Sequence, residues 1–281
     1  MSERFVTIDG IEICTESFGE PANPAILLIM GAQSSLIWWE EEFCQRLADA
    51  GRWVIRYDNR DVGRSTTCEP GQPNYTFEDM VEDAVRVVDA YQIKQAHIVG
   101  MSMGGMLTQM LALRYPERIL TVTLLSTSNF APHLPPMEDK VMAFFSKMGA
   151  VDWTNKQSVV GFAVDRSRVL AGSKRLFDEN KVSTLAAQEF TRSINPASMM
   201  NHALLSGGES YLTRTGEIDV PALIIHGTED PIIPYEHAIN LADEIPGSAL
   251  LALEGAGHEL HSDDWDIVIQ SIANHTASTR R

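Results

Sequence analysis

The sequence predicts an α/β protein, with a mostly parallel central sheet, helices on both faces and a helical insertion near the middle of the chain. Short apolar runs alternate with amphipathic stretches in the first and last thirds of the sequence. The run 25–30 is apolar throughout, which is typical of a strand that is buried on both faces of a parallel sheet. The alternation stops over 127–219, where helical segments occur without a convincing strand.

The elements follow from the periodicity and from the residues at their ends. An Asp9-Gly10 pair between two β-rich runs predicts a hairpin, and Pro116 ends the helix that precedes it. The predicted strands are 4–9, 11–18, 25–30, 53–57, 96–99, 120–125, 222–225 and 248–253. The predicted helices outside the insertion are 39–50, 77–91, 104–115, 234–245 and 263–274.

This order predicts one α/β core that is interrupted once. We expect residues 1–126 and 220–281 to form the core and residues 127–219 to form a helical lid. Because the insertion follows the strand at 120–125, it leaves the sheet at the carboxyl end of that strand. A lid is therefore expected over any site at this edge.

Composition excludes several classes of partner. The 281 residues are 44% hydrophobic and carry a formal net charge of −16, which disfavours binding to nucleic acid or to an anionic membrane surface. The three cysteines are odd in number and lack a C-x-x-C pair, which argues against a disulfide framework or a thiolate metal site. The N-terminus has no signal-peptide pattern and no apolar run is long enough to span a bilayer. We expect a cytoplasmic protein without metal or cofactor.

The most informative motif is Gly100-Met-Ser102-Met-Gly104, which fits G-x-S-x-G between a predicted strand and a predicted helix. A serine on such a sharp turn is raised out of the sheet, and the two glycines avoid collisions with neighbouring backbone. The backbone N–H of Met103 then lies at a helix N-terminus, where it can bind a developing oxyanion. We predict that Ser102 is a nucleophile.

The chain order Ser…Asp…His supplies an acid and a base for this serine. Asp230 follows the strand at 222–225 and precedes Pro231, which stiffens the loop, so we favour it over the neighbouring Glu229. His258 follows the last strand after a Gly-rich loop, and it is the only one of the eight histidines in such a position. His226 is expected to be a packing residue. His261 suggests a metal pair with His258, but no third ligand lies nearby in the sequence.

Other residues are candidates by position. The second oxyanion donor is expected from the loop after the strand at 25–30, and the backbone N–H of Ala32 is our candidate. Trp38 and Trp39 follow this loop and are predicted to wall the acyl pocket, although at least one of them is expected to be a packing residue. Met142 and Phe145 in the lid are predicted to line an adaptable apolar substrate pocket.

Taken together, these motifs resemble the α/β-hydrolase superfamily over almost the whole chain, which implies the α/β-hydrolase fold. The segments 28–32, 56–67 and 99–104 look like those of the aclacinomycin methylesterase group and of the serine macrolide esterases. Met30-Gly31 stands here as in that group, in place of a His-Gly pair, whereas Ala32 stands where the family can carry glycine. The resemblance implies hydrolysis of a bulky polyketide-type ester or lactone, such as a macrolide antibiotic, without cofactor or metal.

Several functions stay open at this stage. The resemblance also suits a methylesterase that acts on an anthracycline-like metabolite. The same triad serves thioesterases, carbon–carbon bond hydrolases and cofactor-free haloperoxidases. A receptor that uses the fold to bind a small ligand is the non-enzymatic alternative. The sequence does not distinguish a monomer from a dimer.

Overall fold

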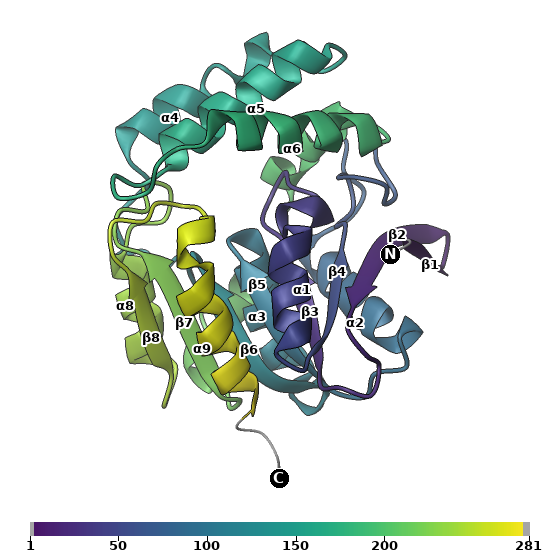
Figure 1. Ribbon diagram of the computed structural model, residues 1–281, viewed down its shortest axis with the longest axis vertical. Coiled ribbons are helices and arrows are strands. Elements are labelled where there is room, and N and C mark those ends of the chain that lie inside the picture. The colour runs from purple at the N-terminus through teal and green to yellow at the C-terminus, as the bar shows by residue number, and fades with distance from the viewer. Residues whose placement is uncertain (1–2, 278–281) are drawn as a thin grey trace.

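The computed structural model describes residues 3–277 and contains one eight-stranded sheet in the order β1-β2-β4-β3-β5-β6-β7-β8 (Figure 1). The strand β2 is antiparallel to both β1 and β4, and the remaining neighbours are parallel. The strands are β1 Arg4–Ile8, β2 Ile11–Phe18, β3 Ala25–Ile29, β4 Trp53–Tyr57, β5 Ala96–Met101, β6 Ile119–Leu125, β7 Ala222–Gly227 and β8 Ala249–Leu253. Each corresponds to a run predicted from the sequence.

The first hairpin illustrates how a local signal determines the register. Asp9 and Gly10 both have positive φ, at 53° and 80°, as a two-residue hairpin turn of this handedness requires. The turn joins β1 and β2 so that Phe5 lies opposite Cys14. Met1 and Ser2, the first residues of the N-terminus in which no signal-peptide pattern is expected, lie outside the described residues.

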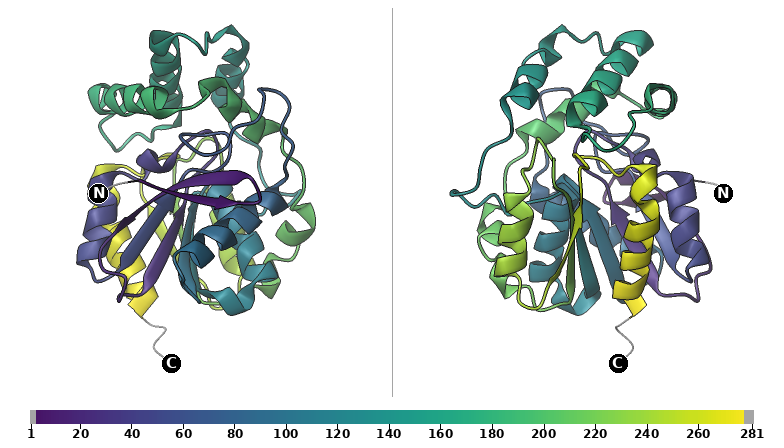
Figure 2. Two further views of the ribbon diagram at one scale, coloured as in Figure 1. Left: turned by 90° about the vertical axis from the view of Figure 1, so that its right-hand side faces the viewer. Right: turned by 60° about the vertical axis from the view of Figure 1, so that its left-hand side comes forward.

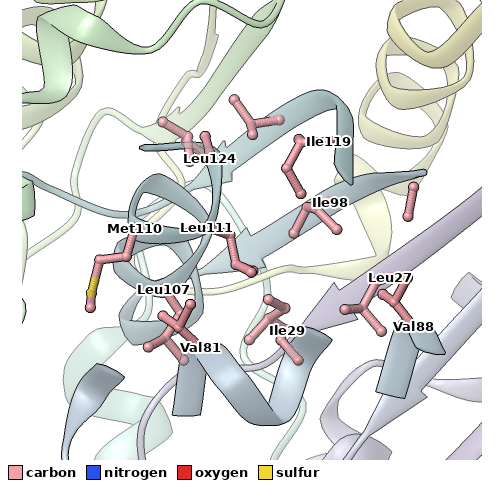
Figure 3. Close-up of a cluster of buried hydrophobic side chains, with 14 of the residues drawn as sticks. Leu27, Ile29, Val81, Val88, Ile98, Leu107, Met110, Leu111, Ile119 and Leu124 are labelled. Atoms are coloured by element: carbon pink, nitrogen blue, oxygen red, sulfur yellow. The ribbon is translucent and has the colours of Figure 1, made fainter. Parts of the chain in front are cut away.

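Helices cover both faces of the sheet, and each face has its own apolar core. On one face, α2, α3 and α8 pack on the sheet, and Figure 3 shows Val81 and Leu107 of these helices against Ile29. On the other face, α1 and α9 place Phe43 and Val268 in a second buried cluster. These helices are α1 Glu41–Asp49, α2 Phe77–Ala90, α3 Met103–Arg114, α8 Glu236–Glu244 and α9 Trp265–Ala277. The central strands β3, β4, β5 and β7 are thus buried on both sides, as their apolar sequences predict.

The segment between β6 and β7 contains helices and no strand. Its longer helices, α4, α5 and α6, lie above the carboxyl edge of the sheet (Figures 1 and 2). We call residues 139–195, from the start of α4 to the residue before η4, the cap; residues 126–138 connect it to β6. The elements of the segment are α4 Asp139–Phe145, η3 Met148–Ala150, α5 Lys156–Leu170, α6 Glu179–Arg192, η4 Pro196–Leu204, α7 Glu209–Leu212 and η5 Thr215–Glu217.

The chain after the cap returns along the side of the core. The backbone N–H of Gly208 donates to a carboxylate oxygen of Glu78 on α2 at 2.8 Å, and the N–H of Phe77 donates to the carbonyl of Ser206 at 3.2 Å. Within residues 3–277, none of the helices has the length and apolar character that crossing a bilayer demands.

Candidate active site

The serine of the G-x-S-x-G motif lies on a sharp turn between β5 and α3. Ser102 has φ 54° and ψ −119°, a conformation that is rare for a residue with a side chain. A Cβ atom on Gly100 would lie 2.1 Å from the carbonyl oxygen of Gly104, and one on Gly104 would lie 2.1 Å from the carbonyl oxygen of Ile29. The two glycines are therefore required by close backbone approach, for the reason inferred from the sequence.

Core backbone and one core hydroxyl hold this turn in place. The N–H of Ser102 donates to the carbonyl of Leu125 at 2.9 Å, and the hydroxyl of Thr127 donates to the carbonyl of Ser102 at 2.7 Å. A Cβ atom on Gly31 would meet the Cβ of Ser102 at 3.1 Å, so the loop after β3 also fits closely against the serine. The hydroxyl of Ser102 is thereby presented at the carboxyl edge of the sheet.

The structure brings the predicted acid and base together. Nδ1 of His258 donates to Oδ2 of Asp230 at 2.6 Å, across 28 positions of sequence. The other carboxylate oxygen of Asp230 accepts from the backbone N–H groups of Ile232 and Ile233 at 3.0 and 2.8 Å. Asp230 is only 3% exposed, so these partners satisfy an otherwise costly buried charge.

The ionisation of Asp230 follows from these contacts. Burial alone would raise the pKa of Asp230, but the charge of His258 and hydrogen bonds from His226 and His258 outweigh it and hold the pKa below its ordinary value. The rival acid, Glu229, lies elsewhere: its carboxylate accepts from the N–H and hydroxyl of Ser173 at 2.7 and 2.8 Å. An ionised Asp230 beside Nδ1 fixes one tautomer of His258, which leaves Nε2 free to accept a proton.

His226 has a second contact that sequence reasoning missed. Its Nε2 donates to the carbonyl of Ile233 at 2.7 Å and lies 3.4 Å from Oδ2 of Asp230. The ring is completely buried, in agreement with the expected packing role. The one signal in the sequence for this contact is the position of His226 at the end of β7, four residues before Asp230, which places both residues at the loop after that strand.

Ser102 and His258 both line one cavity of about 820 Å³ beneath the cap. Within residues 3–277, no hydrogen bond joins the hydroxyl of Ser102 to the imidazole of His258. Catalytic hydrogen bonds of this kind often tighten only when a substrate is bound. The cavity walls are largely apolar and include Met30, Trp38, Phe145, Leu170, Phe177 and Leu185.

The four candidate pocket residues have different environments. Trp38 and Phe145 line the cavity. Trp39 is fully buried in the core, where its ring stacks on Phe43 at 5.7 Å, and it does not line the cavity. Met142 is 52% exposed and also lies outside the cavity lining. The adjacent tryptophans therefore divide into one packing residue and one cavity residue.

The two candidate oxyanion donors come from segments next to the serine, since Ala32 follows Gly31, which packs on Ser102, and Met103 follows Ser102 directly. Ala32 lines the cavity, and Met103 is the first residue of α3, where a backbone N–H has no acceptor within the helix. Gln33, the residue after Ala32, has φ 62° and donates its backbone N–H to Nδ1 of His202 at 2.9 Å. On the other side of the ring, Nε2 of His202 donates to the carbonyl of Arg60 at 2.7 Å. Burial lowers the pKa of His202. No sequence motif indicated this neutral support for the oxyanion loop.

The segment 170–175 between α5 and α6, which we call the cap linker, is docked on the loops that carry the acid and the base. The N–H of His258 donates to the carbonyl of Leu170 at 2.8 Å. Glu259 accepts from the N–H of Gly172 at 3.0 Å, and Glu229 accepts from Ser173 as described above. The sequence neighbours of both Asp230 and His258 therefore bind the same part of the cap.

No group of three or more His, Cys, Asp or Glu side chains within residues 3–277 is arranged to hold a metal ion. His261 instead donates Nε2 to the carbonyl of Leu176 at 3.2 Å, and its Nδ1 lies 3.6 Å from Asp263. The arrangement as described provides a hydroxyl, an imidazole–carboxylate pair and two backbone N–H groups. These are the parts that acyl transfer requires.

Comparison with known proteins identifies the family to which the chain belongs. Residues 24–264 match the family described as the alpha/beta hydrolase fold. The rhodomycin D methylesterases DauP of Streptomyces sp. (strain C5) and DnrP of Streptomyces peucetius are 32% and 31% identical to the chain, each over 98% of both sequences. The esterase RhEst1 from Rhodococcus sp. ECU1013 has a TM-score of 0.79 at 19% identity, over 99% of this chain and 100% of that one. The chain therefore belongs to the α/β-hydrolase fold family and is a hydrolase.

Proposed function

We propose that the protein is a serine carboxylic-ester hydrolase that acts on a bulky polyketide-type ester or lactone, such as a macrolide antibiotic. One observation carries the proposal. The 2.6 Å pair of His258 and Asp230 and the strained turn of Ser102 meet at one large, mainly apolar cavity. A buried, ionised carboxylate that fixes a histidine tautomer, together with a serine hydroxyl that lines the same cavity, is the arrangement of an activated nucleophile.

The proposed reaction has two halves. Ser102 attacks the ester carbonyl while His258 takes the hydroxyl proton, and Asp230 stabilises the resulting imidazolium. The N–H groups of Ala32 and Met103 bind the negative oxygen of the tetrahedral intermediate, where one such donor is typically worth about 10²–10³ in rate. His258 then returns the proton to the leaving alcohol. Water, deprotonated by the same imidazole, releases the acid from Ser102.

A second candidate, a methylesterase of an anthracycline-like metabolite, is favoured by the full-length similarity to the two rhodomycin D methylesterases. The size of the cavity and its apolar walls suit either a macrolide or a polycyclic methyl ester.

The three free thiols of Cys14, Cys44 and Cys68 suit a reducing compartment, and we propose that the enzyme acts in the cytoplasm.

Labelling with a fluorophosphonate probe tests the nucleophile. We expect one label on the wild-type protein, none on Ser102→Ala, and undiminished labelling of Ser210→Ala, a control serine exposed on α7. Labelling that persists in Ser102→Ala would remove the proposed nucleophile. Absence of any label, with tight binding of an unchanged ester, would favour the receptor alternative.

Mass spectrometry of a macrolide, an anthracycline methyl ester and a short p-nitrophenyl ester tests the substrate class. Hydrolysis of the macrolide ring supports the first candidate, and release of methanol from the anthracycline supports the second. Turnover of the short ester alone would contradict both. Preference for a thioester, for carbon–carbon cleavage or for halogenation under the same conditions would assign one of the other triad reactions.

A further inference from the structure

Arg166 on α5 lines the cavity that holds Ser102 and His258. Its guanidinium lies over the ring of Trp38, with Cζ 5.5 Å from the ring centroid. Within residues 3–277, Arg166 forms no hydrogen bond and no ion pair. A half-buried guanidinium with five unused N–H donors is costly unless another group meets it.

The other arginines of this segment and the lysine that lines the cavity differ from Arg166 in this respect. Lys181, which also lines the cavity, pairs with Glu40 at 2.9 Å. Each of the remaining arginines between residues 127 and 219 has a carboxylate partner, the pairs being Arg168–Glu179, Arg175–Asp264, Arg192–Asp58 and Arg214–Glu217. The free guanidinium is therefore particular to the cavity and not a general property of this surface.

The acidic side chains around the cavity are already occupied. Glu40 pairs with Lys181, Glu179 with Arg168, and Glu259 accepts from backbone N–H groups. The acid that acts electrostatically on Arg166 is Glu189, but its carboxylate bonds to the hydroxyl of Ser35 instead. Burial raises the pKa of Glu189 to about 7, which weakens its charge near neutrality.

We propose that Arg166 forms a subsite for an anionic oxygen, a carboxylate or an ionised phenol, on the part of the substrate that does not react. The guanidinium lies over the ring of Trp38, and its N–H donors have no partner among residues 3–277, so a planar anion in the cavity can accept two of them at once. Arginine, more than lysine, provides this planar fork. This inference rests on the proposed esterase function and specifies the chemistry of its substrate.

Matched esters on one aromatic skeleton test the subsite. Methyl 2-naphthoate is neutral, monomethyl naphthalene-2,6-dicarboxylate carries a carboxylate, and methyl 6-hydroxy-2-naphthoate carries a phenol that is assayed above and below its own pKa. We expect Arg166→Met to lower kcat/KM for the anionic esters by about 10- to 100-fold, the range of a charge-assisted hydrogen bond. For the neutral ester, we expect Arg166→Met to change kcat/KM by less than about threefold, because this ester has no anionic oxygen to lose and only its apolar contacts with the side chain are altered. Whichever anionic ester shows the loss identifies the oxygen source.

Binding measured without turnover separates this inference from the esterase proposal. In the Ser102→Ala background, tryptophan fluorescence reports binding of the monomethyl ester and of the neutral dimethyl ester. We expect Arg166→Met to weaken only the monomethyl ester, Arg166→Lys to weaken it less, and Arg168→Met, a loss of the same charge at an exposed residue of the same helix, to weaken neither. Equal weakening of both esters, or no preference for the anionic ester in the parent protein, would overturn the subsite. Absence of fluorophosphonate labelling at Ser102 would instead overturn the esterase proposal and leave the binding result standing.

Discussion

The nucleophile turn and the acid–base loops lie at the same edge of the sheet, but different parts of the chain hold them. The turn of Ser102 is fixed by core residues, through the carbonyl of Leu125, the hydroxyl of Thr127 and the close approach of Gly104 to Ile29. The loop of His258 is bonded to the cap linker, where a Cβ atom on Gly257 would lie 2.1 Å from the carbonyl oxygen of Leu170.

This difference indicates which part of the chain positions each catalytic group. The core places the nucleophile without help from the cap. The acid and the base are placed by core and cap together, because Glu229 and Glu259 both reach the cap linker. Changes at the nucleophile turn should therefore affect folding, whereas changes at the cap linker should affect the alignment of His258.

The largest effect on activity is expected from Asp230→Asn. An amide at this position no longer fixes the tautomer of His258, and kcat should fall by on the order of 10⁴ while the fold is retained. Steady-state hydrolysis of an activated ester measures the loss. The matched control is Glu229→Gln, for which we expect less than a tenfold change, since Glu229 binds Ser173. The opposite ranking of the two variants would assign the acid to Glu229.

Gly104→Ala tests the core side of the comparison. The new methyl group would lie 2.1 Å from the carbonyl oxygen of Ile29, so β3 and α3 must separate. A cost of about 4 kcal/mol is expected, which lowers Tm by roughly 10 °C in a domain of this size. The control is Gly161→Ala on α5, where nothing lies within 4 Å of the added atom and alanine favours the helix. Similar melting temperatures for the two variants would contradict the proposed close approach.

Gly257→Ala tests the cap side. Its methyl group collides with the cap linker, so we expect the linker to move away from the loop of His258. The activity per labelled active site should fall about 10- to 100-fold, as misplacement of a catalytic group typically costs. The decrease in Tm should be smaller than that of Gly104→Ala. If Gly257→Ala melts as early as Gly104→Ala but keeps full activity per active site, the cap linker has no role in aligning His258.

The smallest effect is expected on stability, from Glu189 on α6 of the cap. Its carboxylate accepts from the hydroxyl of Ser35, just after the oxyanion loop. Burial raises the pKa of Glu189 from 4.5 to about 7, so the folded state keeps a proton that the unfolded state loses between these values. The carboxyl group therefore lowers stability as pH rises through this window. We expect Glu189→Gln, which retains a partner for Ser35, to stabilise the protein by about 1–2 kcal/mol above the window and by little below it. Denaturant unfolding at both pH values measures this, and a gain that does not depend on pH would contradict the assignment.

The sequence by itself determined the fold class, the strand order along the chain and the candidates Ser102, Asp230 and His258. These follow from local information: periodicity defines the strands and helices, and each candidate lies in the turn or loop that follows a strand whose carboxyl end meets the same edge of the sheet. Only distances were missing, and the structure supplies the 2.6 Å contact between the acid and the base.

Tertiary structure alone decided which neighbouring residues face the cavity and which segments support the site. Trp38 and Trp39 are adjacent and chemically identical, yet one lines the cavity and the other stacks in the core. The short 3-10 helix η1, Leu36–Trp38, ends between them. The contacts of His202 with Gln33 and of the cap linker with His258 join residues that are 169 and 88 positions apart. Such pairs leave no periodic or motif signal in one sequence, since only the packing of the complete chain brings them together.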